Sequence, residues 1–241
     1  MGHVERVQDY DGYLLRFPGA DAARAIVMFH GFPAHRNTRN LDLAIELSRR
    51  TQASIYFLHY RGLGESLGDF SFTAAVAEGV ALVERVVNRE KHTSVALFGA
   101  SFGGLVALNA AREHAGDVQR VLLASPLLDM SEDAPLFPWL VDGVRKDVAG
   151  IFGERSPAEV RADARLLLQN HLPSRFGQEL DAELEVTVLQ SASDDVTPAE
   201  VARRVVPTFA AKTTYEELAT DHSFQENRAA VLFEKAALVF A

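Results

Sequence analysis

One serine of this chain lies in a setting that is typical of a nucleophile. Ser101 is the centre of the motif Gly-Ala-Ser-Phe-Gly at 99–103, which follows an apolar run at 94–98 and precedes a stretch of small residues. A Gly-x-Ser-x-Gly turn from a strand into a helix exposes the serine hydroxyl, and its glycines let neighbouring backbone pack closely. The turn also leaves the backbone N–H of Phe102 at a helix N-terminus, where it can stabilise an oxyanion. We therefore predict that Ser101 is a nucleophile; the alternative is a glycine-rich turn without chemistry.

Three histidines follow Ser101 and are candidates for the general base that such a serine needs. With this kind of turn the chain order is serine, then acid, then histidine. His114 lies late in the helix that begins at the turn and His171 ends another expected helix, so both are expected to be exposed to solvent. His222 follows an expected strand at 214–218 and lies on the same edge of the sheet as Ser101, where open α/β sheets bind their ligands. We predict that His222 is the base.

The acid that orients the base has three candidates. Asp194 and Asp195 follow an expected strand at 186–190, and the segment Thr-Pro-Ala-Glu at 197–200 is a capping box that predicts the next helix. Two adjacent carboxylates cannot both orient one imidazole. Asp221 is the third candidate, but its position next to His222 makes the far ring nitrogen hard to reach. The spacing alone leaves Asp194 and Asp195 open.

A second oxyanion donor is expected from the loop after the strand at 25–29, which contains His-Gly-Phe-Pro at 30–33. Pro33 has no N–H and favours an extended conformation at the residue before it. The N–H of Phe32 is therefore the predicted donor. His30 could be taken for a base, but we expect it to brace the loop.

Strand-like and helix-like segments alternate, which predicts an α/β fold with a mostly parallel sheet covered by helices on both faces. An antiparallel hairpin is expected at 4–8 and 13–17. The other expected strands are 25–29, 54–59, 95–98, 118–124, 186–190 and 214–218, and the expected helices are 41–50, 72–89, 102–113, 198–205 and 226–240.

An insertion at about 127–183 interrupts this alternation, and we expect it to form a small cap over the carboxyl edge of the sheet. It begins with prolines and then contains Ser-Pro-Ala-Glu at 156–159, a capping box with proline at the first helical position, which predicts a helix to about residue 169. Its aromatic side chains could line a substrate pocket or merely pack the cap onto the body of the protein. These are Phe137, Trp139, Phe152 and Phe176.

Length and composition limit the class of protein. A chain of 241 residues, 48% of them hydrophobic, is suited to a single α/β domain. The formal net charge of -9 disfavours a nucleic-acid partner. The absence of cysteine excludes disulfides and thiolate metal sites and fits a cytoplasmic protein. We see no signal segment and no apolar run that could span a bilayer, and we expect no integral membrane association.

Taken in chain order, these motifs resemble the α/β-hydrolase family over nearly the whole chain. The resemblance rests on His-Gly-Phe at 30–32, Tyr-Arg-Gly-Leu-Gly-Glu-Ser at 60–66, the serine turn, the aspartate loop and His222. In the family a proline often stands four residues after the acid, which favours Asp194 because residue 198 is proline. The family's glycine three residues before the acid is here Ser191. The loop at 30–37 and the small insertion look most like the cinnamoyl and feruloyl esterases, with monoacylglycerol lipases and prolyl-oligopeptidase-like hydrolases as neighbours. Residues 100 and 102 are not the His and Gln of that esterase group.

The resemblance implies a serine carboxylic-ester hydrolase that acts on small to medium acyl or aromatic (phenolic) esters through an acyl-enzyme. Its catalytic residues would be Ser101, Asp194 and His222, with Phe32 and Phe102 as oxyanion donors and no metal or other cofactor. A peptidase, lipase or thioesterase of the same fold is the first alternative. A non-catalytic ligand-binding protein is the alternative of another class.

Overall fold

A computed structural model describes residues 4–10, 12–33, 38–225 and 228–241. Within these residues eight strands form one sheet in the order β1-β2-β4-β3-β5-β6-β7-β8. Strands β1–β2 and β2–β4 pair antiparallel and all other neighbours pair parallel, which confirms the predicted mostly parallel sheet with its initial hairpin. The bounds are Glu5–Arg6 (β1), Tyr13–Phe17 (β2), Asp21–Phe29 (β3), Ala53–His59 (β4), Ser94–Ala100 (β5), Val118–Ala124 (β6), Glu185–Ser191 (β7) and Lys212–Leu218 (β8).

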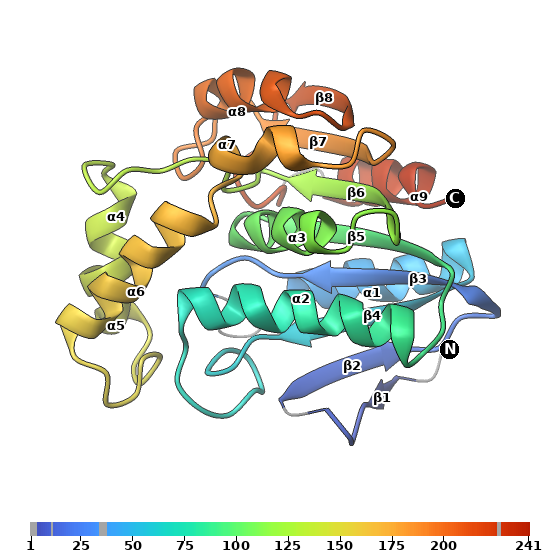
Figure 1. The fold of residues 1–241 in the computed structure, drawn as a ribbon, viewed down its shortest axis with the longest axis horizontal. Coiled ribbons are helices and arrows are strands. Elements are labelled where there is room, and N and C mark those ends of the chain that lie inside the picture. Colours follow the sequence, from blue (N-terminus) through green and yellow to red (C-terminus); the bar gives the residue numbers. More distant parts are fainter. Residues whose placement is uncertain (1–3, 11, 34–37, 226–227) are drawn as a thin grey trace.

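The central strands are apolar on both faces because helices cover both. In β3, Val27 and Phe29 belong to one core while Ile26 and Met28 belong to the other, since successive side chains of a strand point to opposite faces. Helices α2 (Phe72–Asn88) and α3 (Phe102–Glu113) pack in the first core, and α1 (Thr38–Thr51) and α9 (Glu234–Val239) in the second. Figure 1 shows α2 and α3 in front of the sheet and α1 and α9 behind it.

The end of the chain differs in detail from the single helix expected at 226–240. Its expected first residues, 226 and 227, lie outside the described residues. A π-helical segment, η4 (Ala229–Phe233), precedes α9. Short helical segments also flank β8 on its N-terminal side: α8 (Ala199–Val205) and the 3₁₀ segment η3 (Val206–Thr208).

The expected insertion at 127–183 is largely helical. It contains α4 (Leu136–Pro138), the π-helical η1 (Trp139–Gly143), α5 (Val144–Asp147), α6 (Pro157–Asn170), α7 (Pro173–Phe176) and the 3₁₀ segment η2 (Gly177–Glu179). The capping box that opens α6 is confirmed. Figure 1 shows α4, α5 and α6 beyond the carboxyl ends of the parallel strands.

A buried carboxylate fastens the insertion to the body of the protein. Asp163 of α6 accepts hydrogen bonds from the backbone N–H of Phe72 at 2.8 Å and from the hydroxyl of Thr73 at 2.6 Å, in the first turn of α2. Helix N-terminal N–H groups lack intrahelical acceptors and stabilise negative charge. Arg155 also pairs with this carboxylate, at 3.3 Å. The insertion is therefore held in place beside the edge of the sheet that carries Ser101. No helix in the described parts of the chain has the length and apolar character needed to cross a membrane.

Candidate active site

Ser101 lies in a sharp turn between β5 and α3, as its glycine-rich motif predicts. Its φ of 53° and ψ of -120° place the backbone in a conformation that non-glycine residues rarely adopt. A Cβ atom at Gly103 would lie 2.2 Å from the carbonyl oxygen of Phe29, and one at Gly99 would lie 2.4 Å from that of Gly103. Only glycine fits at these two positions, because strand and helix backbones approach so closely.

Hydrogen bonds on both sides hold Ser101 in this conformation. Its N–H donates to the carbonyl of Ala124 at 2.9 Å, and its own carbonyl accepts from the N–H of Leu127 at 2.9 Å. Backbone in such a region costs on the order of 1–3 kcal/mol and persists only where the surroundings enforce it. Here the hydrogen bonds to the end of β6 and to the segment after it hold the backbone in place. The hydroxyl points to the carboxyl edge of the sheet.

The structure brings Ser101, His222 and Asp194 together in a line. His222, on the loop after β8, has its Nε2 3.1 Å from the Ser101 Oγ. Its Nδ1 lies 2.9 and 2.8 Å from the two carboxylate oxygens of Asp194. The side chain of Asp194 is fully buried and that of His222 is 19% exposed. A histidine bonded in this way has its tautomer and orientation determined by the carboxylate.

The other candidate histidines and aspartates lie elsewhere. His114 is buried, with Nε2 3.0 Å from the Val80 carbonyl, so the prediction that it is exposed was wrong: α3 packs against α2 at this point. His171 is half-buried against Asn109. Asp195 is exposed, and Asp221 accepts the N–H of Gln225 at 2.7 Å.

The loop after β7 surrounds the Asp194 carboxylate with donors. Its Oδ1 accepts the backbone N–H groups of Val196 at 2.9 Å and Thr197 at 2.8 Å. Its Oδ2 accepts the Thr197 hydroxyl at 2.9 Å and the Gln190 amide at 3.2 Å. Burial raises the pKa of Asp194, but the hydrogen bond and positive charge of His222 and the loop donors outweigh it, and the pKa is lowered overall.

Thr197 has a different role from the one that its capping-box pattern indicated. Its hydroxyl is directed at Asp194 and at the carbonyl of Ser125, 3.1 Å away, and lies 3.3 Å from the His222 Nδ1. The N-cap of α8 is Pro198, without a side-chain cap, so the predicted capping box at 197–200 was wrong. The sequence did contain a signal for this loop. An aspartate side chain often accepts hydrogen bonds from the backbone N–H groups two and three residues after it, which turns the loop back around the carboxylate.

Ser191, where the family pattern has glycine, also takes part in this network. It is fully buried and donates its hydroxyl to the carbonyl of Thr220 at 2.5 Å, while its N–H donates to the Ser125 hydroxyl at 3.1 Å. Ser191 therefore connects the aspartate loop to the loop that carries His222. Sequence reasoning missed this contact because its two partners are 29 positions apart.

The loop at 30–33 approaches Ser101 closely. A Cβ at Gly31 would lie 3.2 Å from the Ser101 Cβ, so the backbone passes directly beside Ser101. His30 is fully buried and its Nδ1 donates to the Gly31 carbonyl at 2.7 Å, which agrees with the bracing role expected for it. Burial lowers the pKa of His30 to about 3, so the ring is neutral. Phe32 and Phe102 line the same small cavity as Ser101.

That cavity has a volume of about 30 Å³, and its lining side chains are apolar except for the hydroxyl groups of Ser101 and Thr197 and the indole N–H of Trp139, which donates to Asp147. Trp139, for which both a pocket and a packing role had been open, lines it. Phe137 and Phe152 do not: both are 1% exposed and pack in the main core, because the insertion needs large side chains beneath it. Phe176 is buried, and the Cζ atom of the Arg112 guanidinium lies 4.4 Å from the centroid of its ring. The aromatic side chains of the insertion therefore serve mainly as packing. The cavity is further lined by Phe72, Leu127, Leu136, Leu140, Leu167 and Val196.

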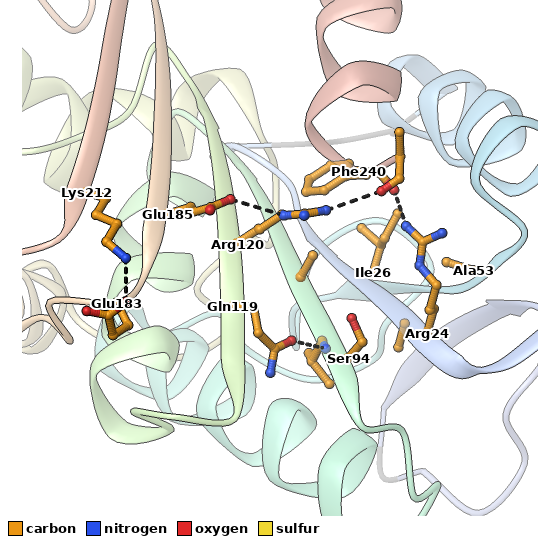
Figure 2. Close-up of a pocket in the computed structure, with 14 residues that line it drawn as sticks. Arg24, Ile26, Ala53, Ser94, Gln119, Arg120, Glu183, Glu185, Lys212 and Phe240 are labelled. Carbon is orange, nitrogen blue, oxygen red and sulfur yellow. Dashed lines mark hydrogen bonds and ion pairs between the residues drawn. The ribbon is translucent and has the colours of Figure 1, made fainter.

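A cavity of about 490 Å³ lies at the opposite, amino edge of the sheet (Figure 2). Its charged groups are paired within the structure: Arg120 with Glu185 at 3.2 Å, Lys212 with Glu183, and Arg24 with the carbonyl of Phe240. It is far from Ser101 in the fold, because β5 begins beside it and ends at the serine. Among the described residues, no group of three or more His, Asp or Glu side chains is arranged to hold a metal ion.

Comparison with known structures shows the same architecture. The structure is similar to a monoacylglycerol lipase from Paleococcus ferrophilus (TM-score 0.73, 20% identity, 96% of this chain and 98% of that one). It is also similar to Est1E from Butyrivibrio proteoclasticus with ferulic acid bound (TM-score 0.69, 14% identity, 98% and 96%) and to an esterase from Exiguobacterium antarcticum (TM-score 0.67, 17% identity, 100% and 99%). At these identities the likeness concerns the fold. The model of the family described as serine aminopeptidase, S33, matches residues 20–170, more than half of the chain. With its sheet, its serine turn and this match, the protein belongs to that family of serine hydrolases with the α/β-hydrolase fold.

Proposed function

We propose that the protein is a carboxylic-ester hydrolase with Ser101 as nucleophile, His222 as general base and Asp194 as the acid. The observation that carries this proposal is the unbroken line of contacts from the Ser101 hydroxyl through both ring nitrogens of His222 to a fully buried carboxylate. A serine on a strained turn with such a partner is a group prepared to donate its proton during attack.

The proposed reaction has two halves. Ser101 Oγ attacks the ester carbonyl carbon while His222 Nε2 takes the hydroxyl proton, and the ionised Asp194 stabilises the imidazolium. The N–H groups of Phe32 and Phe102 receive the oxyanion, since both residues adjoin Ser101 and Phe102 begins α3. His222 then protonates the leaving alcohol. Water activated by the same ring releases the carboxylic acid and restores the serine.

The walls of the cavity beside Ser101 favour esters over the peptides that the family description names. An aminopeptidase must bind the ammonium group of its substrate, which calls for a carboxylate near the scissile bond. The lining of this cavity contains no charged side chain. In this proposal the segment at 127–183 is the cap, the partner is a small-molecule ester, and the location is cytoplasmic.

The proposal is tested with the purified protein and its Ser101→Ala variant. Wild type should be labelled by a fluorophosphonate and should hydrolyse phenyl acetate, whereas the variant should do neither, because a methyl group cannot attack. Aminoacyl anilides and acyl-CoA, tested in parallel, distinguish a peptidase or thioesterase. Absence of labelling in the wild type would contradict the proposal and favour a ligand-binding protein.

A further inference from the structure

A second cavity adjoins the one beside Ser101 and is much larger, at about 470 Å³ compared with about 30 Å³. The two cavities share four lining residues and therefore lie side by side: Leu127, Leu136, Val196 and Thr197. One wall of the larger cavity is the segment at 126–136 after β6. The other is the aspartate loop with the first turns of α8.

The larger cavity lies on the His222 side of Ser101. Asp195 and Pro198 line this cavity and not the small one, and both belong to the loop whose Asp194 lies 2.8 Å from the His222 Nδ1. The two proposed oxyanion donors line only the small cavity. A leaving alcohol must depart toward the imidazole that protonates it, whereas the carbonyl oxygen must point to the oxyanion donors. The larger cavity is therefore placed to receive the alcohol.

The two cavities differ in the size of the group that each can hold. A volume of about 30 Å³ holds roughly two water-sized groups, which leaves room for a short acyl chain only. A volume of about 470 Å³ falls within the range of pockets that bind whole small molecules, roughly 300–1,000 Å³. The space around Ser101 is therefore strongly asymmetric.

The charges of the larger cavity balance one another. Its lining contains two aspartates and two arginines, and Asp129 is already engaged by Arg204, by the Ser174 hydroxyl at 2.9 Å and by the Met130 N–H at 3.0 Å. Apolar side chains such as Val201 and Leu128 make up much of the rest. Such a surface offers no excess charge to a phosphate or carboxylate group, so it suits an uncharged alcohol with an apolar body and polar edges.

We propose that the larger cavity binds the leaving alcohol, and that the substrates are esters of a short acid, of about two or three carbons, with a bulky uncharged alcohol. This inference rests on the proposed ester hydrolysis and adds a substrate class to it.

Two matched series of esters test the assignment in the wild type. Phenyl acetate, propanoate and hexanoate vary only the acid, and phenyl acetate and 1-naphthyl acetate vary the alcohol with leaving groups of similar acidity. We expect kcat/KM for the hexanoate to be about tenfold or more below that for the acetate, because the small cavity would be overfilled. We expect 1-naphthyl acetate to be hydrolysed at least as efficiently as phenyl acetate. A hexanoate that reacts as well as the acetate would overturn the assignment.

Filling the larger cavity gives a second, independent readout. Val201→Trp on α8, and Ala134→Phe on the opposite wall, should each lower the ratio of kcat/KM for 1-naphthyl acetate to that for phenyl acetate by about tenfold. Glu200→Trp is the matched control, since Glu200 is exposed on the same helix and outside the lining, and it should leave the ratio unchanged. If the two cavity-filling variants instead lower kcat/KM for phenyl hexanoate relative to phenyl acetate, the larger cavity binds the acid and the assignment is wrong. If the wild type hydrolyses none of these esters, the proposed function itself fails.

Discussion

Replacement of Asp194 by Asn is the sharpest test of the catalytic arrangement, because it keeps the shape of the side chain. Oδ1 of Asp194 accepts two backbone N–H groups, so the amide oxygen of the asparagine must take this place. The amide NH₂ then occupies the position of Oδ2, at which the Gln190 amide and the His222 Nδ1 are both directed. The amide oxygen, 2.9 Å from Nδ1, already accepts two backbone N–H groups, so the clash of donors is best relieved when His222 moves its proton from Nδ1 to Nε2.

A proton on Nε2 points at the Ser101 hydroxyl and prevents the ring from accepting the serine proton. The same variant also lacks the negative charge that stabilises the imidazolium. A loss in kcat of about ten-thousand-fold is known for this change in another serine hydrolase triad, and it corresponds to about 5.5 kcal/mol of transition-state stabilisation. We expect a loss of this size here.

Asp195→Asn is the matched control, since it removes the same charge from the adjacent, exposed residue. Exposed charges interact weakly, so kcat should fall by about tenfold or less. The assay is steady-state hydrolysis of phenyl acetate, with thermal melting of both variants to establish that they are folded. A larger loss for Asp195→Asn than for Asp194→Asn would refute the assignment of the acid. Equal and small losses would refute the tautomer argument.

Two further changes probe the surroundings of the site. Thr197→Val should lower kcat by roughly 10–100-fold, because a hydrogen bond to a charged group contributes about 1.5–3 kcal/mol; Thr197→Ser should restore most of it, and no difference between the two variants in steady-state kinetics would contradict a role for the hydroxyl. The pKa of His30 is lowered to about 3 by burial, whereas an unfolded histidine has a pKa near about 6.5. The unfolded chain therefore binds the extra proton, and this contribution to stability is complete above about pH 6.5 and is lost as the pH falls toward 3. His30→Gln should remove about 2 kcal/mol from the difference in unfolding free energy between pH 6.5 and 5, measured in urea; an unchanged difference would count against a neutral buried ring.

Local patterns in the sequence were enough to predict the frame of this protein. Alternating apolar segments predicted a mostly parallel sheet, because a strand covered on both faces must be apolar along its length. The glycines around Ser101 predicted the sharp turn, since their need for close backbone contact is local. The order of serine, aspartate loop and histidine predicted which residues the carboxyl edge of the sheet would bring together, because parallel strands place their following loops on one edge.

Only the tertiary structure decided the contacts that depend on where side chains point across the fold. It turned the Thr197 hydroxyl toward Asp194 and buried His114 between two helices, and it placed Asp194 against His222 where residue spacing alone had left Asp195 open and only the family resemblance had favoured Asp194. It also placed Phe137 and Phe152 in the core, where the choice between packing and pocket had been open. The physical reason is the same in each case: a rotation of one residue, or the packing of one helix against another, settles the environment of a side chain, and neither is recorded in the spacing of residues along the chain.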